Sequence, residues 1–169
     1  MKNIFVALCV CIAVVFGALI GTPHLTAAAA PNPPSQGYTL HIDALGHFPA
    51  HPSEVAHHWC KGGLAGGLIE CQLYDSDAPN ADLIGVETIV SASMFRSFPA
   101  GERTMWHYHK TEIPAVHATL PGMSPAQQKK VVASIINTYG KIYVLFDPMT
   151  TRSTPTGKPS VTTPSEMPH

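Results

Sequence analysis

The stretch Gly67-Leu-Ile-Glu-Cys-Gln-Leu-Tyr74, followed by Leu83-Ile-Gly-Val-Glu-Thr-Ile-Val90, decides the fold class. Both runs are rich in Ile, Leu and Val, and the segment that joins them, Asp75-Ser-Asp-Ala-Pro-Asn80, is dense in residues that favour turns. Two such runs around a turn-forming segment predict a β-hairpin with a long loop. An antiparallel sheet is therefore expected at the centre of the fold.

Helices and further strands are predicted on both sides of this hairpin. A short helix is expected to open at Pro52-Ser-Glu54, to run through Trp59 and to end at Gly62-Gly63. The other short elements expected are a turn of helix over 93–98, a second over 101–109 and a strand over 114–120, which begins at Pro114.

The longest predicted helix begins at Ser124-Pro-Ala-Gln127, a capping box with proline at the first helical position. Apolar residues then recur at helical spacing as far as Tyr139, and Gly140 ends the helix. A final strand is expected over 141–146. This mixture predicts the α+β class: a single small domain with a mainly antiparallel sheet, one long helix and a few short ones.

The two ends of the chain differ in composition from the body. Met1-Lys-Asn3 leads into the apolar run Ile4–Ile20, and the small residues Thr26–Ala30 follow, as in a cleaved signal peptide. An uncleaved membrane anchor is the alternative. Cleavage predicts an exported protein, periplasmic or secreted. The expected divisions are a signal peptide (1–29), a Pro-rich flexible leader (30–37), the folded body (38–148) and a Pro/Thr-rich disordered tail (149–169).

The charge of the chain is nearly balanced, with 10 Lys and Arg against 11 Asp and Glu. Such a chain has no basic field for a nucleic acid, so no nucleic-acid partner is expected. The motifs of serine hydrolases, zincins, phosphate-binding loops and Cys-x-x-Cys redox proteins are missing from the sequence. The unusual count is histidine, with 10 residues.

Side chains that bind metal ions recur along the body. On a helix, His57 and Cys60 would share one face. His107 and His109 point to one side if their segment is extended, and diverge if it is helical. Neutral imidazole and thiolate are ligands of zinc or copper. The candidate metal ligands are His57, His58, Cys60, Cys71, Glu87, His107 and His109.

Glu87 belongs to this set because it stands in an apolar run. If it is buried, it requires a partner or a raised pKa. A metal ligand, a proton-transfer group and a member of a buried ion pair are the functional interpretations. The alternative is an outward position on a half-exposed strand.

The cysteines and histidines also have structural interpretations. Outside the cytoplasm, Cys60 and Cys71 would form a disulfide. Closing a loop of this size would stabilise the folded state by roughly 3 kcal/mol. Packing beside the indoles of Trp59 and Trp106 is the alternative for the neighbouring histidines. The histidines expected to face solvent are His41, His47 and His51.

Five stretches occur in a characteristic order: His57-His58-Trp59-Cys60, Glu70-Cys71-Gln72-Leu73-Tyr74-Asp75-Ser76-Asp77, Leu83-Ile84-Gly85-Val86-Glu87, Trp106-His107-Tyr108-His109 and Thr138-Tyr139-Gly140-Lys141. Together they resemble the oil body-associated protein family. The resemblance implies a common fold over most of the body and a lipid or membrane surface as a partner, but no established reaction or cofactor. With the leader, it points to an exported bacterial member.

The favoured function is therefore an exported binding protein with a His/Cys metal site that holds zinc or copper. The alternative is an envelope protein without metal, stapled by a disulfide, with a structural or lipid-associated role. A metalloenzyme is a less favoured interpretation, and a metal-free enzyme such as a hydrolase would need a nucleophile paired with a base, which the sequence does not display. The sequence predicts no oligomeric state.

Overall fold

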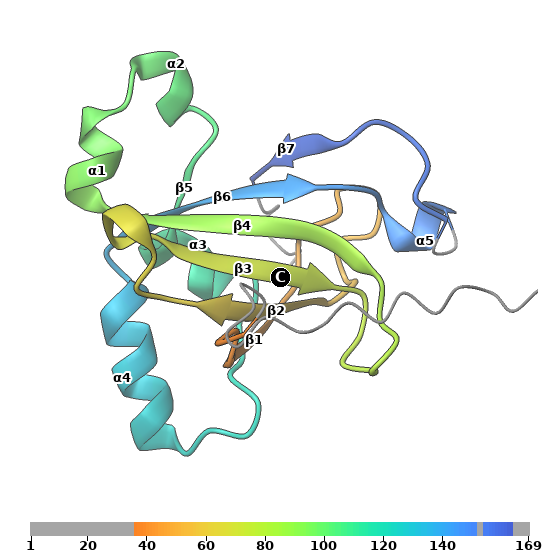
Figure 1. Ribbon diagram of the computed structural model, residues 1–169, viewed down its shortest axis with the longest axis horizontal. Helices are drawn as coiled ribbons and strands as arrows, with labels where there is room; N and C mark the ends of the chain where they lie inside the picture. The colour runs from red at the N-terminus through yellow and green to blue at the C-terminus, as the bar shows by residue number, and fades with distance from the viewer. Residues whose placement is uncertain (1–35, 152–153, 164–169) are drawn as a thin grey trace, which may run out of the picture. The chain divides into compact units, whose positions relative to one another are not determined.

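A seven-stranded sheet forms the centre of the computed structural model, which describes residues 36–151 and 154–163 (Figure 1). The strand order is β1-β2-β3-β4-β6-β5, and β7 also pairs with β6. All the pairings are antiparallel, so the expected α+β class with an antiparallel sheet is confirmed. The strands are β1 (Leu40–Ala44), β2 (Ala56–Lys61), β3 (Ile69–Tyr74), β4 (Leu83–Ser91), β5 (His107–Tyr108), β6 (Thr138–Val144) and β7 (Ser160–Thr162).

Helices connect and flank these strands. They are α1 (Ala92–Ser97), α2 (Ala100–Arg103), α3 (His109–Ala115), α4 (Pro125–Ile135), α5 (Pro148–Thr151) and the 3-10 turn η1 (Ala65–Gly67). The capping box at Ser124 is present, as the sequence predicts. In the described part of the chain, no helix has the length and apolar character needed to cross a membrane.

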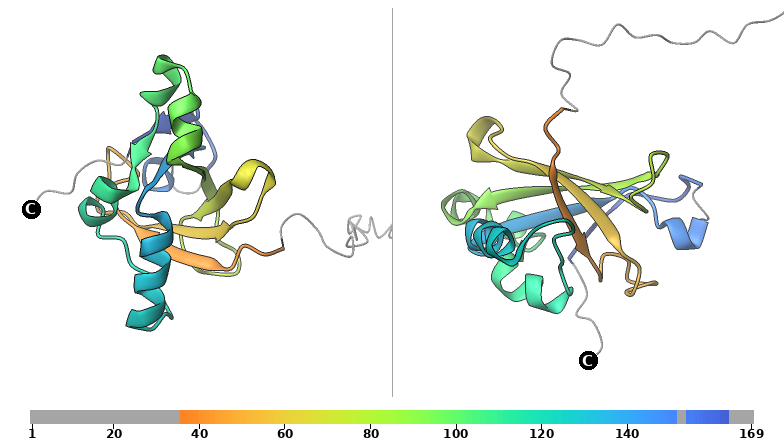
Figure 2. Two further views of the ribbon diagram at one scale, coloured as in Figure 1. Left: turned by 90° about the vertical axis from the view of Figure 1, so that its left-hand side faces the viewer. Right: turned by 90° about the horizontal axis from the view of Figure 1, so that it is seen from below.

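One face of the sheet carries the core. Along β2, Ala56, His58 and Cys60 are buried, because alternate residues of a strand point to the same side. Ile42 of β1 lies opposite His58 and shares this face. Helices α3 and α4 border it, since Ile113 and Ile135 line a cavity together with Ile42 and His58 (Figures 1 and 2).

The hairpin expected from the sequence is formed by β3 and β4, with Ile69 opposite Ile89. On the other side of β3, Cys71 lies opposite Cys60 of β2, and the two sulfurs form a disulfide. The bond therefore joins neighbouring strands on the core face, where both cysteines are buried.

The helix expected to run from Pro52 through Trp59 is wrong. Residues 56–61 form β2, which pairs with β1 on one side and β3 on the other. The long-range pairing and the burial of alternate side chains outweigh the local helix signal. As a consequence, His57 and Cys60 point to opposite faces, and His58 shares the face of Cys60.

The strand expected over 114–120 is also wrong. Helix α3 includes Pro114, and only Thr119 forms an isolated bridge, to Asp43. Packing of Ile113 and Val116 around the core cavity accounts for the helix despite its proline. Similarly, α4 ends at Ile135, before the expected stop at Gly140, which lies within β6.

Two short elements lie in the stretch after residue 148. Helix α5 includes Met149, and Ser160–Thr162 forms β7 against the edge of β6. The disorder expected over 149–169 therefore does not hold for these residues. The signal peptide predicted over 1–29 lies outside the described residues.

Candidate metal centre

A buried carboxylate lies between two imidazoles on the core face. Glu87 projects from β4, His107 from β5, and His109 from the first position of α3. Glu87 Oε1 is 3.1 Å from His107 Nε2 and 3.3 Å from His109 Nε2. One ligand atom from each of these residues lies within 4.8 Å of the other two. We call this set the inner cluster.

The backbone of β6 makes room for the inner cluster at Gly140. This residue lies opposite His107 in the β5–β6 pair and opposite Ile89 in the β4–β6 pair. A Cβ atom at residue 140 would collide with Glu87 Oε1 and His107 Nε2. The absence of a side chain at this position therefore allows the carboxylate and the imidazole to meet.

Two further histidines adjoin the inner cluster. His58 Nε2 lies 3.8 Å from Glu87 Oε2 and 3.1 Å from His47 Nε2. The Nδ1 atoms of His58 and His47 each lie 2.9 Å from a backbone carbonyl oxygen, of Ala56 and Leu45 respectively. A carbonyl oxygen only accepts hydrogen bonds, so each Nδ1 carries a hydrogen.

It follows that the two facing Nε2 atoms both present lone pairs when the rings are neutral. Burial lowers the pKa of His47 to about 3 and also lowers the pKa of His58, so both rings are neutral near pH 7. Two lone pairs at 3.1 Å repel each other unless a proton is shared between them as a hydrogen bond or another cation lies close to both. The pair therefore favours a bound positive ion.

The ring of His109 is fixed at both nitrogens, and although burial lowers its pKa, the hydrogen bond and charge of Glu87 raise it above its usual value. Thr138 Oγ1 donates to the carbonyl oxygen of Ile135 and thus accepts the hydrogen of His109 Nδ1, at 2.7 Å. The Nε2 atom of His109 lies 3.3 Å from Glu87 Oε1, where it donates a proton to the carboxylate or, once deprotonated, presents a lone pair to a shared ion. A second partner that fixes the ring of a histidine ligand in this way is usual at metal sites.

His107 is buried, and neither of its ring nitrogens makes a hydrogen bond within the described part of the chain. Glu87 Oε1 lies near its Nε2 atom but in a direction unsuited to a hydrogen bond. Unpaired buried nitrogens are costly, and a metal ion would satisfy Nε2.

The electrostatics of the inner cluster suit a cation. Burial alone would raise the pKa of Glu87, but His107 and His109 hold it well below its usual value, so the group is a carboxylate. Glu112 of α3 lies 3.8 Å from His107 Nε2, and burial raises its pKa. Two acidic groups thus border a space lined by imidazoles.

The distances also fit coordination by one ion. Metal–ligand bonds of about 2.1 Å in a tetrahedron place ligand atoms roughly 3.4 Å apart. The separations of 3.1 and 3.3 Å at Glu87 Oε1 are close to this value. The residues therefore fit a metal ion with nitrogen and oxygen ligands.

The sequence-predicted candidates separate into three groups. Glu87, His107, His109 and His58 come together in or beside the inner cluster. Cys60 and Cys71 are bonded to each other, so neither offers a thiolate. His57 lies on the opposite face of the sheet.

Two residues of this region were missed by the sequence reasoning. His47 is buried although it was expected to face solvent. Glu112, three residues after His109, was not singled out, although a carboxylate one helical turn from a candidate ligand is a usable signal. The segment 107–109 is neither wholly extended nor wholly helical, since β5 gives way to α3 at His109.

Comparisons with known proteins give a family but no reaction. A family described as "Protein of unknown function (DUF1264)" matches residues 33–168. Oil body-associated protein 1B of Arabidopsis thaliana is 34% identical over 106 residues, which cover 63% of this chain and 44% of that protein. Oil body-associated protein 2B of Zea mays is 35% identical over 111 residues, covering 66% and 44%.

The chain thus spans about half the length of the curated relatives it matches, or less. No solved structure matches the chain.

Proposed function

We propose that this chain, which belongs to the oil body-associated protein family (DUF1264), is a metal-binding protein that holds a zinc ion in the inner cluster. The family membership confirms the resemblance expected from the sequence motifs, whereas bacterial origin stays a prediction. Glu87, His107 and His109 are the proposed ligands. His58 and His47 supply two further donor nitrogens beside them.

The observation that carries this proposal is the convergence of one ligand atom each from Glu87, His107 and His109 within 4.8 Å, where both ring nitrogens of the buried His107 have no hydrogen-bond partner within the described residues. The adjoining His47 and His58 each donate Nδ1–H to a backbone carbonyl oxygen, so their Nε2 atoms face each other beside the Glu87 carboxylate. The two imidazoles of His107 and His109 around the Glu87 carboxylate are a ligand set suited to a divalent cation.

The donor set favours zinc over copper(I). Copper(I) prefers soft sulfur ligands, and the two sulfurs near the core are joined in the Cys60–Cys71 disulfide. Imidazole nitrogen with carboxylate oxygen is a common zinc ligand set. A copper(II) ion bound by the same side chains is an outcome that the metal analysis below distinguishes.

A binding role fits the surroundings of the inner cluster better than catalysis does. The adjoining cavity has a volume of about 50 Å³ and is lined mainly by apolar side chains such as Ile89, Val116 and Ile135. Pockets for organic substrates are usually several hundred cubic ångströms. We therefore propose that the ion is held for binding or structure and that a metalloenzyme activity ranks behind it.

The test is metal analysis of natively purified protein, without chelator or affinity metal, by mass spectrometry of the elements. Glu87→Gln removes the proposed carboxylate ligand and should lose one equivalent of zinc relative to wild type. The matched control is Glu70→Gln, on the neighbouring strand β3, whose carboxylate contacts Tyr38 and no metal candidate. Equal zinc content in wild type and Glu87→Gln would overturn the proposal.

A lipid surface is the second candidate partner, because the curated relatives carry the name "oil body-associated". Among the residues that the structure describes, the exposed large hydrophobic side chains are Leu83, Leu145, Met149 and Val161. Leu83 begins β4 and Leu145 follows β6, so these two lie at one end of the sheet.

Replacing Leu145 and Met149 by Ser should weaken co-flotation with triacylglycerol emulsions. Failure of the unmodified protein to float would exclude lipid binding.

We also propose that the chain is exported. The apolar run followed by small residues supports a cleaved leader, and the disulfide is a bond that persists in oxidising compartments. Expression of the full chain should give a mature protein that begins at Ala29 or Ala30. A protein that retains Met1 after export to the periplasm or medium would contradict cleavage.

A further inference from the structure

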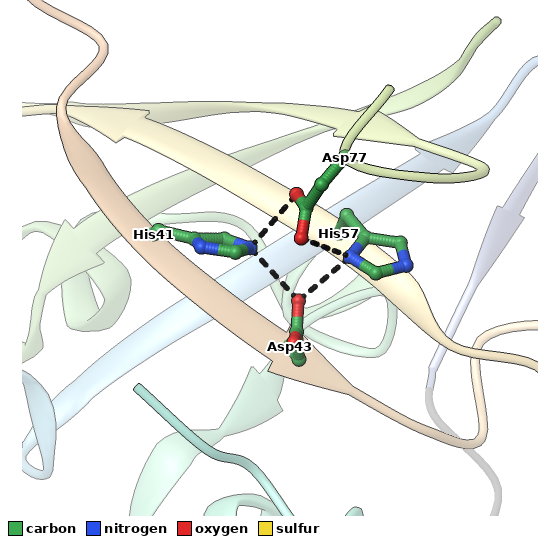
Figure 3. Close-up of side chains that lie close together, drawn as sticks. All are labelled: His41, Asp43, His57 and Asp77. Carbon is green, nitrogen blue, oxygen red and sulfur yellow. Dashed lines mark hydrogen bonds and ion pairs between the residues drawn. The ribbon is translucent and has the colours of Figure 1, made fainter. Parts of the chain in front are cut away.

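Four side chains converge on the face of the sheet opposite the inner cluster (Figure 3). They are His41 and Asp43 of β1, His57 of β2, and Asp77 of the loop between β3 and β4. We call this set the outer cluster. Within the described residues, it is the second group in which three or more metal-binding side chains lie within 4.8 Å of one another.

The strand register explains how the outer cluster forms. His41 and Asp43 are two residues apart, so they point to the same side of β1. Asp43 lies directly opposite His57, and His41 lies opposite Trp59, on the neighbouring strand β2. The long hairpin loop then brings Asp77 over the two histidines (Figure 3).

The contacts in the outer cluster form a closed ring of nitrogen and oxygen atoms. Asp43 Oδ1 is 2.9 Å from His41 Nε2 and 2.9 Å from His57 Nδ1. Asp77 reaches the same two nitrogens through its separate oxygens, with Oδ1 3.1 Å from His41 and Oδ2 3.2 Å from His57. Each histidine nitrogen therefore faces two carboxylate oxygens.

Hydrogen bonds alone do not satisfy this arrangement. A ring nitrogen carries at most one hydrogen, so it cannot donate fully to both carboxylates. His41 forms a hydrogen bond with Asp43, but the buried Nδ1 atom of His57 has no hydrogen-bond partner within the described part of the chain. The outer cluster also brings two carboxyl groups to the same two ring nitrogens, an arrangement of oxygen and nitrogen atoms that a divalent cation could share.

We propose that the outer cluster is a second zinc-type site, independent of the inner cluster. His41 Nε2, His57 Nδ1, Asp43 and Asp77 are the ligands. The neighbouring nitrogen–oxygen distances of 2.9–3.2 Å are somewhat shorter than the roughly 3.4 Å between ligands of a tetrahedral ion, so a small outward movement of the side chains would admit one ion. Nitrogen and oxygen ligands in equal number suit zinc.

Trp59 supports two members of the outer cluster. Its indole stacks on His41, with the ring centres 4.4 Å apart and the planes 6° apart. Its Nε1–H donates to Asp77 Oδ1 at 3.3 Å. Trp59 and Asp77 also line a surface hollow of about 330 Å³. An ion in the outer cluster would therefore lie next to an indole and near solvent.

The ligand side chains of the two sites differ in solvent exposure, so an exchange experiment can distinguish the sites. Asp77 is 44% exposed and His57 19% exposed, whereas Glu87 of the inner cluster is 7% exposed. An ion in the outer cluster should exchange quickly with a chelator, and an ion in the inner cluster slowly. Zinc should therefore leave the native protein in two phases, the fast one belonging to the outer cluster.

The fluorescence of Trp59 is a direct probe of metal binding in the outer cluster. The chain contains 2 tryptophans, so only one other indole has to be removed. Trp106 contacts Glu102 and Lys141, outside both clusters, so Trp106→Phe leaves Trp59 as the single indole. Cobalt(II) added to this variant after chelator treatment should quench Trp59 fluorescence with saturation at one equivalent, and excess zinc should reverse the quenching. Tetrahedral cobalt should also give visible absorption bands.

In the same background, His57→Gln and Asp77→Asn should each raise the dissociation constant for cobalt by at least about 100-fold. Asp77 lies in a loop, so Asp77→Asn tests the site even if a strand variant fails to fold. The matched control is His51→Gln, which breaks a separate His51–Asp147 pair and should leave cobalt binding unchanged.

Absence of saturable quenching below millimolar cobalt would overturn the proposal. Equal cobalt affinity in the parent and Asp77→Asn would overturn it as well. Loss of the slow zinc phase in Glu87→Gln with retention of cobalt binding at Trp59 would support two independent sites. If the inner cluster held no metal, the outer cluster would still give the fast phase, so the two proposals fail separately.

Discussion

The backbone of β6 passes closest to the inner cluster at Gly140. Gly140→Ala would place a methyl group against Glu87 Oε1 and His107 Nε2. We expect this variant to lose the slow-exchanging zinc and to lower the free energy of unfolding by roughly 1–3 kcal/mol, the usual cost of overpacking. Metal analysis and urea unfolding would measure both effects.

Gly101→Ala is the control for this substitution. Gly101 lies in α2, and an added Cβ there contacts nothing within 4 Å. The control should keep its zinc and should be unchanged or slightly more stable, because Ala favours a helix over Gly. A Gly140→Ala protein with full zinc content would contradict the proposed position of the ion.

Tyr38, which belongs to neither ligand set, gives a prediction of pH dependence. Its hydroxyl donates to Glu70 Oε1, and this hydrogen bond, with burial and the charge of Glu70, raises the pKa of Tyr38 to about 12. The folded chain therefore holds a proton that the unfolded chain releases near pH 10. The stabilisation is present below pH 10 and is lost as the pH rises toward 12.

Ultraviolet titration of tyrosine would measure this shift, with Tyr38→Phe identifying the late-titrating group. In Glu70→Gln the pKa of Tyr38 should move back toward 10, because the main cause of the shift is removed. Identical titration curves for Glu70→Gln and the unmodified chain would contradict the assignment.

Single residues differed in how far the sequence could predict them. Glu87 could be singled out, because a carboxylate in an apolar strand requires a partner wherever the strand packs. The burial of His47 could not be predicted, because it depends on packing against β2, a separate element of the sequence. In the fold, Nε2 of His58 on β2 lies 3.1 Å from Nε2 of His47. The outer cluster was missed for the same reason, since its members meet through strand register and a loop.

At the scale of elements, the hairpin was predictable because its two apolar runs and turn residues are adjacent in the sequence. Strand β2 was not, because a helix-like start signal at Pro52-Ser-Glu54 precedes its six residues, which become a strand through pairing with β1 and β3. Local signals thus decided the elements formed by local contacts. Which metal-ligand candidates come together could not be predicted without the non-local strand pairings, because these determine the face of the sheet on which each histidine lies.

The Cys60–Cys71 bond is the covalent link between β2 and β3. Replacing both cysteines by Ala should lower the free energy of unfolding by about 3 kcal/mol, because the unfolded chain regains the entropy of an open loop. Zinc content should not change, since the sulfurs are not ligands. Denaturant unfolding and metal analysis of the double variant would check both results, and loss of zinc would restore the cysteines as ligand candidates.

At the scale of the whole molecule, β7 covers part of the last edge of the sheet. Its residues Ser160–Thr162 pair with Ile142, Tyr143 and Val144 of β6. A chain ending at Gly157 would expose this edge to other strands. We expect a loss of about 2 kcal/mol in the free energy of unfolding, from a few lost hydrogen bonds, and greater aggregation.

A chain ending at Thr163 keeps β7 and is the control for this truncation. Light scattering during heating would compare the two chains. The same aggregation temperature in both would contradict a protective role of β7.

The sheet as a whole places the two proposed metal sites back to back. On β2, His58 points to the inner cluster and His57 to the outer one, since adjacent residues of a strand face opposite sides. The adjacent histidines His57 and His58 therefore contribute one side chain to each face of the sheet. The two sites are expected to bind metal independently, because each has its own ligands.

The zinc X-ray absorption spectrum of natively purified protein tests the central claim most directly. A brief chelator wash should first remove the exchangeable ion from the outer cluster. The account predicts one remaining zinc with only nitrogen and oxygen neighbours at about 2.0–2.2 Å, including the scattering pattern of imidazole. Sulfur neighbours at about 2.3 Å, or no zinc after native purification, would contradict it.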